Sequence, residues 1–234
     1  MTVSVILLAH NEAASVAAEL RAFHREVVER IPGGELIVAE DGSRDGTRER
    51  IAELAREIPL RLVGGPKRLG YRNAMLGAIG ASDRPWIFLC DAGRKHDPAD
   101  FWRLYELREQ YDLIVGRKAH RTDQWHRRLL SWGLNLFLRH YFGAPVRDAD
   151  SGMRLLNRRA VAAVMAHPLI FRECSGSEIV IRAIAANLRY AEVPVSYAQR
   201  DGKSSGMPAR KIPRAIGWLL SDARQLRRQL RSSA

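Results

Sequence analysis

The sequence predicts a single α/β domain with a mainly parallel central sheet that helices cover on both faces. In the first half of the chain, short and nearly continuous apolar segments alternate with segments of helical periodicity, which is typical of parallel strands buried on both faces. The chain has 234 residues and is 46% hydrophobic, which suits one domain, or one domain with a tail. No apolar run approaches the roughly 18 residues of a spanning helix.

The first half alternates strands and helices in a regular order. Strands are expected at residues 3–9, 36–39, 60–63, 86–90 and 113–115, and helices at 12–30, 47–58, 70–81 and 100–110. The first helix, for example, carries apolar residues at helical spacing at Val16, Leu20, Phe23 and Val27. The opening apolar run lacks a preceding basic residue and a following cleavage site, so we interpret it as a strand and not as a signal peptide.

The second half is less regular. Helices are expected at 125–142, 158–166, 177–186 and 208–231, a strand at 190–197, and loops at 148–154 and 202–208. Pro194 favours an edge position for the strand, because proline cannot donate to a sheet ladder. The last helix has an apolar stripe at Ile212, Ile216, Leu219, Ala223, Leu226 and Leu230. We therefore expect a catalytic domain over 1–207 and a basic amphipathic helix over 208–234.

The positive charge is concentrated at the C-terminus. The net charge is +12, and residues 200–234 hold nine Lys or Arg against Asp201 and Asp222, which gives +7. This asymmetry indicates an anionic partner, either a membrane surface or a nucleic acid. A nucleic acid is the weaker candidate, since the tail has only Trp218 as an aromatic and no known nucleic-acid motif. The two cysteines lie in or beside apolar segments, which favours a reducing compartment.

Polar residues follow the predicted strands, where open α/β sheets bind ligands. They are His10-Asn11-Glu12, Glu40-Asp41-Gly42-Ser43, Asp91-Ala92-Gly93 and Gly116-Arg117. Three of these four loops contain carboxylates. The Asp41 carboxylate can accept hydrogen bonds from a nucleobase or ribose, and Gly42 lets the backbone approach a ligand closely. The alternative is a plain strand-to-helix turn with Asp45 or Thr47 as the helix cap.

An ordered set of motifs resembles family 2 of the glycosyltransferases, and within it the polyprenyl-phosphate mannosyl- and glucosyltransferases of the dolichyl-phosphate type. The set runs from residue 3 to about 206 and comprises His10-Asn11-Glu12, Glu40-Asp41-Gly42-Ser43, Asp45-Gly46-Thr47, Asp91, Gly116-Arg117, Ser151-Gly152-Met153-Arg154, Glu192-Val193-Pro194-Val195 and Arg200 to Ser204. The resemblance implies a GT-A-like fold, the fold of nucleotide-diphospho-sugar transferases. It also implies a nucleotide-sugar pocket that includes Asn11, Glu12, Asp41, Gly42 and Ser43.

The chain departs from the family at its metal motif. Where the family has Asp-x-Asp, which holds a divalent cation against the donor diphosphate, the chain has Asp91 and then Gly93. Oxygen ligands suit Mg²⁺ or Mn²⁺, so the loss leaves the metal requirement open. In one interpretation Arg94 and Lys95 neutralise the leaving diphosphate in place of the metal.

Two other interpretations of the altered motif stay open. In one, Asp91 still holds a weaker metal together with Asp97 or His96. In the other, the protein binds a nucleotide sugar without catalysis.

The resemblance also implies residues for catalysis and for the acceptor. Asp148 precedes the Ser-Gly motif and is the candidate general base, with Asp150 as the neighbouring alternative. Arginine matches phosphate oxygens bidentately. The candidates for binding phosphates and the acceptor are Arg117, Arg127, Arg128, Arg200, Lys203 and Ser204. Arg127 and Arg128 face solvent in the alternative interpretation.

The leading hypothesis is an inverting transferase that moves a hexose from a UDP- or GDP-sugar to a polyprenyl phosphate, in the cytoplasm or peripherally on the cytoplasmic face of a membrane. The alternatives are a soluble acceptor, a non-catalytic sugar-nucleotide-binding homologue or partner subunit, and a nucleotidyltransferase. The glycine-rich loop that a nucleotidyltransferase needs after its first strand is missing. The last helix is expected to lie on an anionic membrane, or else to pack on the domain or on a second subunit, so an oligomer stays open.

Overall fold

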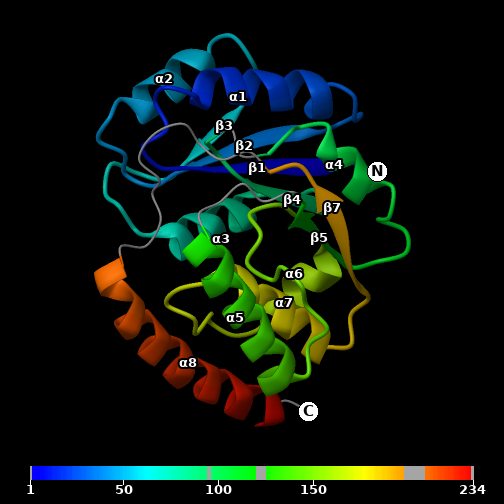
Figure 1. Ribbon diagram of the computed structural model, residues 1–234. Coiled ribbons are helices and arrows are strands. Elements are labelled where there is room, and N and C mark those ends of the chain that lie inside the picture. The colour runs from blue at the N-terminus through cyan, green and yellow to red at the C-terminus, as the bar shows by residue number, and fades with distance from the viewer. Residues whose placement is uncertain (1, 94–95, 120–124, 198–208, 233–234) are drawn as a thin grey trace.

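The computed structural model describes residues 2–93, 96–119, 125–197 and 209–232, which form a three-layered α/β fold around one sheet (Figure 1). The strands are β1 (Val3–Ala9), β2 (Glu35–Glu40), β3 (Arg61–Val63), β4 (Trp86–Asp91), β5 (Leu113–Lys118), β6 (Arg154–Asn157) and β7 (Tyr190–Val195). Their order in the sheet is β3-β2-β1-β4-β6-β5-β7. β6 is antiparallel to both of its neighbours, and the other pairings are parallel.

Helices cover both faces of this sheet. They are α1 (Val16–Phe23), the π-helix η1 (His24–Val28), α2 (Thr47–Leu54), α3 (Tyr71–Ala81), α4 (Asp100–Tyr105), α5 (Trp125–Phe142), α6 (Arg158–Met165), α7 (Ser175–Ala185), the 3₁₀-helix η2 (Ala209–Lys211) and α8 (Ile212–Ser232). Because side chains alternate along a strand, β1 sends Ile6 and Leu8 into one core with α3 and α5–α8. It sends Val5 and Leu7 into a second core with α1, η1, α2 and α4.

The predicted fold class is confirmed, and β7 does lie at the sheet edge as Pro194 indicated. One element was missed. Residues 154–157 form β6, which inserts antiparallel between β4 and β5 and pairs Arg154 with both Leu89 and Val115. The first predicted helix is also different in detail, because regular α-helix begins only at Val16 and continues as the π-helix η1.

The apolar stripe of α8 packs largely on the domain. Ala223 and Leu226 are buried in the first core, and Leu219 and Leu230 pack against it. The buried Asp222 carboxylate accepts hydrogen bonds from the Arg172 guanidinium and backbone, at distances down to 2.5 Å. From Leu219 to Leu230, the stripe therefore packs on the domain and not on a membrane or a second subunit.

Hydrogen bonds to Asp112 connect the ends of β5, β6 and β7 at the edge of the sheet opposite the polar loops. They predict that the stability of the fold depends on pH. The buried Asp112 accepts hydrogen bonds from Arg189 N and from Asn157 Nδ2. Burial raises the pKa of Asp112, but the hydrogen bonds from Arg189 and Asn157 outweigh burial and lower it from 3.8 to about 2. Because the folded pKa is depressed, this stabilisation is present above about pH 3.8 and is lost as the pH falls towards 2.

Asp112→Asn is therefore expected to lower the free energy of unfolding at neutral pH by about 1–2 kcal/mol, after allowance for screening of the exposed Arg189. Urea unfolding at a series of pH values measures this. The gap between variant and wild type should close as the pH approaches 2. Asp83→Asn, at a carboxylate that is 78% exposed, is the control. A gap of constant size at every pH would contradict the assignment.

Candidate active site at the carboxyl ends of β1, β2 and β4

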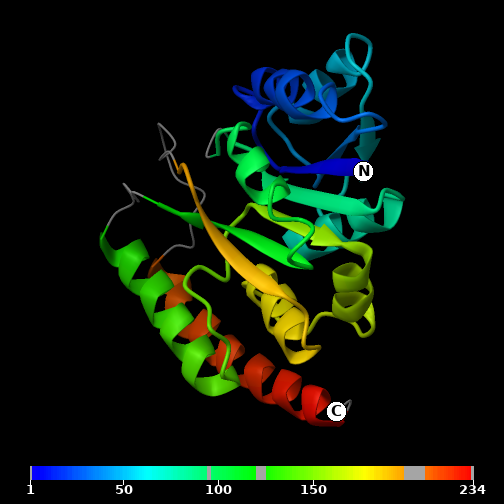
Figure 2. The same ribbon diagram turned by 90° about the vertical axis from the view of Figure 1, so that its right-hand side faces the viewer.

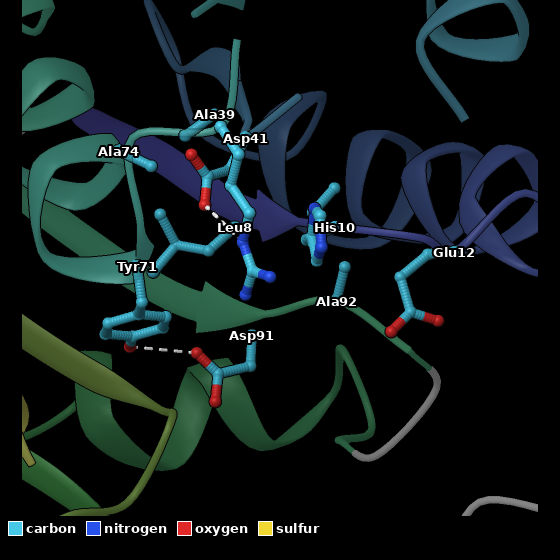
Figure 3. A pocket seen from close by; sticks show the side chains of 11 residues that line it. Leu8, His10, Glu12, Ala39, Asp41, Tyr71, Ala74, Asp91 and Ala92 are labelled. Atoms are coloured by element: carbon cyan, nitrogen blue, oxygen red, sulfur yellow. Dashed lines mark hydrogen bonds and ion pairs between the residues drawn. The ribbon is translucent and has the colours of Figure 1, made fainter. Parts of the chain in front are cut away.

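A cavity of about 200 Å³ lies where β1 meets β2 on one side and β4 on the other. The chain order reverses at this place in the sheet, and such switch points are where open α/β folds bind ligands. The lining residues are Leu8, Ala9, His10, Glu12, Ala39, Asp41, Arg68, Tyr71, Ala74, Asp91 and Ala92. Figure 3 shows Asp41 and Asp91 on opposite sides of Leu8 and His10. Three of the four polar loops predicted from sequence therefore meet here.

Two of these loops brace one another. Asn11 N donates to Ser43 Oγ, and Asn11 Oδ1 accepts from Arg44 N. Glu12 N donates to Thr47 Oγ1. Asn11 has a φ of 56°, which asparagine tolerates better than most residues. Asn11 and Ser43 thus join the two loops and are not among the residues that line the cavity, whereas Glu12 lines it.

Asp41 holds a third loop. Its carboxylate accepts from Leu69 N at 2.6 Å and from Gly70 N at 2.9 Å. Gly42 makes this close approach feasible, because a Cβ there would lie 2.4 Å from Arg68 N and its φ is +61°. The Arg68 side chain then lies over the cavity, with Nε 3.7 Å from Asp41 Oδ2. Asp45 Oδ1 accepts Thr47 N at the start of α2, although the N-cap position itself is held by Gly46 and not by Asp45 or Thr47.

Asp91 forms the opposite wall, at the end of β4. Tyr71, in the first turn of α3, donates its hydroxyl to Asp91 Oδ1 at 2.9 Å (Figure 3). Tyr71 is 41% exposed, yet protein surrounds its hydroxyl so closely that desolvation, and then the Asp91 charge, raise the pKa of the phenol well above its usual value. Gly152 leaves the space for the carboxylate, because a Cβ there would lie 2.3 Å from Asp91 Oδ2.

A buried arginine lies beside these groups. Arg154 is only 1% exposed, and no hydrogen-bond partner for its Nε or Nη1 is found among the described residues. Gly176 in α7 makes room for it, since a Cβ there would lie 1.9 Å from Nη2. Burial lowers the pKa of Arg154, but Tyr71, Asp150 and Asp91 raise it by more, so the guanidinium stays charged.

The two candidate bases have different surroundings. Asp148 is buried, accepts Lys118 N at 3.0 Å and forms an ion pair with Lys118 Nζ at 3.4 Å. Asp150 contacts solvent and interacts with Asp91 and Arg154. Desolvation raises the pKa of Asp150 despite the opposing effects of Arg154 and Lys118. Asp148 is therefore engaged by Lys118, whereas Asp150 is exposed, and the choice between them as the base stays a prediction.

The residues of the altered metal motif fit a divalent cation poorly. Gly93 has a φ of +110°, and a Cβ there would lie 3.0 Å from Glu12 Oε1, so an aspartate at 93 would be strained in this backbone. Asp97 accepts Ala99 N at the start of α4, and the His96 ring packs against Tyr197. Within the described residues, Asp91, His96 and Asp97 do not gather as metal ligands. Next to Asp91 the fixed cation is Arg154.

Other predicted site residues lie elsewhere. Arg117 is near the end of β5, and Arg127 and Arg128 are in the first turn of α5; none of them lines the cavity. Arg94, Lys95, Arg200, Lys203 and Ser204 lie outside the described residues, so their roles stay predictions. Sequence reasoning missed Arg68 and Tyr71. They follow β3, and the same rule that selected the loops after the other parallel strands would have found them.

Comparison with known sequences decides the family. A sequence profile described as glycosyl transferase family 2 matches residues 4–165. The chain belongs to this family. A dolichyl-phosphate hexose transferase of Haloferax volcanii is 27% identical over 207 residues, which are 86% of this chain and 85% of the relative. An undecaprenyl-phosphate 4-deoxy-4-formamido-L-arabinose transferase of Aeromonas hydrophila is 26% identical over 203 residues. The chain spans 60% of the length of that second relative.

Solved structures share the fold. Glucosyl-3-phosphoglycerate synthase of Mycobacterium tuberculosis in complex with phosphoglyceric acid superposes with a TM-score of 0.71 at 22% identity, over 95% of this chain and 80% of that one. Its complex with Mn²⁺, UDP and glucosyl-3-phosphoglycerate gives 0.68 at 20% identity, over the same shares. The predicted GT-A-like fold is thereby confirmed. Within the described residues, no helix is both long and apolar enough to cross a membrane.

Proposed function

We propose that the protein is an inverting hexosyltransferase that moves a sugar from a UDP- or GDP-sugar to a polyprenyl phosphate at the cytoplasmic face of a membrane. The observation that carries this proposal is the cavity at the switch point, with Asp41 on one wall and the Tyr71–Asp91 pair on the other. Membership in family 2 and the similarity to two polyprenyl-phosphate sugar transferases support it.

The donor spans the cavity from Asp41 towards Asp91. The nucleoside lies on the wall formed by His10 and Asp41, where backbone and carboxylate groups offer hydrogen bonds. Arg68, over the same cavity, is placed to contact the diphosphate, for which a guanidinium is well suited. The sugar then lies next to Tyr71 and Asp91, above the fixed charge of Arg154.

In the transfer, an acceptor oxygen bonds to the anomeric carbon from the face opposite the diphosphate. The bond from that carbon to the diphosphate oxygen breaks, and the nucleoside diphosphate leaves with the electron pair. Positive groups stabilise the charge on the leaving group. A phosphate acceptor is already largely ionised near pH 7, because its second pKa is about 6, so it needs no base. For a hydroxyl acceptor, Asp150 would take the proton.

A two-stage experiment tests this function. Saturation-transfer NMR with a panel of UDP- and GDP-sugars identifies the donor, and release of nucleoside diphosphate on addition of a short polyprenyl phosphate in detergent then measures transfer. We expect one donor to bind and to be consumed only with the lipid phosphate. Binding without turnover would leave a non-catalytic sugar-nucleotide binder, and turnover only with a soluble acceptor would overturn the lipid assignment.

Donor binding is expected to depend only weakly on a divalent cation. Gly93 has no side-chain oxygen to bind a metal where the family has its second aspartate, and Arg154 supplies a fixed positive charge. Calorimetric titration of the donor with Mn²⁺ and with EDTA should give affinities that differ by less than about tenfold. Gly93→Asp should lower stability and create no metal dependence. Loss of binding in EDTA that Mn²⁺ restores would favour a metal held by Asp91 instead.

A further inference from the structure

Large apolar side chains are exposed in one region more than elsewhere. Of nine such side chains among the described residues, six belong to α5 and α8. They are Trp125, Leu129, Leu130, Trp132, Ile216 and Leu220. Monomeric proteins rarely leave such side chains clustered on the surface unless the cluster binds something. We call these six residues the α5–α8 surface.

The outer face of α5 is apolar although it does not face the core. Trp125, Leu129 and Trp132 follow one another at i, i+4 and i+7, so they lie on one side of the helix. Trp125 is 76% exposed and Trp132 is 58% exposed. The core-facing side of the same helix carries the buried Asn135 and Leu138. α5 is therefore apolar both towards the protein and away from it.

α8 continues this surface beside α5. Its Arg227 guanidinium stacks over the Tyr141 ring of α5, 4.8 Å from the ring centroid. Ile216 and Leu220 lie on the same side of α8 as Arg227, at spacings of eleven and seven residues. Ile216 is 49% exposed and Leu220 is 39% exposed, so both contribute apolar surface on α8.

The charge on both helices has one sign at the surface. α5 contains no acidic residue, and the one acidic residue of α8, Asp222, is buried against Arg172. Exposed basic side chains accompany the apolar residues on α5, η2 and α8: Arg128, Arg210, Lys211, Arg214, Arg224, Arg228 and Arg231. Exposed apolar and basic side chains on the same helices are complementary to an anionic lipid surface. The α5–α8 surface is not complementary to itself, because a two-fold contact would oppose arginine with arginine.

The surface lies on the active-site side of the molecule. β5 ends at Lys118, at the carboxyl edge of the sheet where the cavity opens, and α5 is the next described element. Figure 2 shows the N-terminal ends of α5 and α8 on the side of the molecule to which the parallel strands point. A protein resting on these two ends would hold its cavity beside the lipid headgroups.

We propose that the α5–α8 surface binds an anionic lipid bilayer peripherally, with Trp125, Leu129 and Trp132 entering the interface. The exposed basic side chains contact lipid phosphates, and Ile216 and Leu220 add apolar surface from α8. Tryptophan suits this depth because its ring is apolar and its N–H is polar. The purpose of the contact rests on the proposed lipid acceptor, but the binding itself follows from exposure and charge and is tested without turnover.

Co-sedimentation of the full chain with vesicles tests the surface. We expect binding to phosphatidylglycerol-containing vesicles, a decrease with salt, and little binding to pure phosphatidylcholine. The double variant Trp125→Ser/Trp132→Ser should lower affinity at least about tenfold, and Arg210→Glu/Lys211→Glu should do likewise. Met165→Ser, at an exposed apolar residue of α6, and Arg50→Glu on α2 are matched controls that should bind like wild type.

Three outcomes would overturn the proposal. They are failure of the wild type to bind anionic vesicles at low salt, equal loss of binding in the controls, and tryptophan variants that change the oligomeric state in light scattering but bind vesicles normally. The last outcome would make a second copy of the chain the occupant. Donor binding by NMR and transfer to a short acceptor in detergent are expected to be unchanged in the tryptophan variants. A failed surface is therefore distinguishable from a failed enzyme assignment.

Discussion

Asp91→Asn is expected to lower kcat for sugar transfer by about 10²–10³-fold, the usual cost of removing one electrostatic group from an active site. Asparagine has nearly the same size, so the space beside Gly152 stays filled and the fold should be unchanged. What is lost is the charge that accepts the Tyr71 hydroxyl and faces Arg154. Because the predicted loss is in the transition state, kcat should fall far more than the donor affinity.

The measurement is steady-state kinetics together with calorimetric titration of the donor. Asp83→Asn is the matched control, since that carboxylate is exposed and does not line the cavity. Tyr71→Phe should give a smaller loss, because it removes the hydrogen bond and leaves the Asp91 charge in place. An Asp91→Asn protein with wild-type kcat would show that Asp91 has only a structural role.

Much of this site could be predicted from sequence because ligand sites in parallel sheets follow the ends of strands. Asp41 and Asp91 were found because each comes directly after a buried apolar segment. Tyr71 and Arg68 come after β3, which has only three residues and is partly exposed. The strand itself was predicted, at 60–63, but Arg68 and Tyr71 lie several residues beyond its end and not directly after it.

Tertiary context decided what periodicity left open. β6 has four residues inside a segment of loop-like composition, too short for alternation to separate strand from loop. The stripe of α8 has the same period whether it meets lipid or protein. Only the fold brings Arg172 to Asp222 and so shows that much of this helix packs on the domain.

The role of Arg154 leads to a second large effect. Arg154→Met is expected to lower the free energy of unfolding by about 1–3 kcal/mol, because it removes the buried cation that faces Asp91 and Asp150. Methionine fills much of the same volume without the charge. Asp91 and Asp150 would then repel each other, with no guanidinium beside them to balance their negative charges. Sugar transfer should be lost as well, since Arg154 lies beside Tyr71 and Asp91, where the sugar is proposed to bind.

A double-mutant cycle separates charge from volume in this cluster. If the charge is what matters, Arg154→Met combined with Asp150→Asn should recover part of the stability lost by Arg154→Met alone, because fewer like charges remain. Arg154→Lys should retain more stability than Arg154→Met. Gly176→Ala tests the position of the charge, because its Cβ would displace Arg154 Nη2 without removing the charge. Equal losses in the Lys and Met variants, with strictly additive effects in the cycle, would mean that Arg154 only fills space, and the electrostatic account of the site would then be wrong.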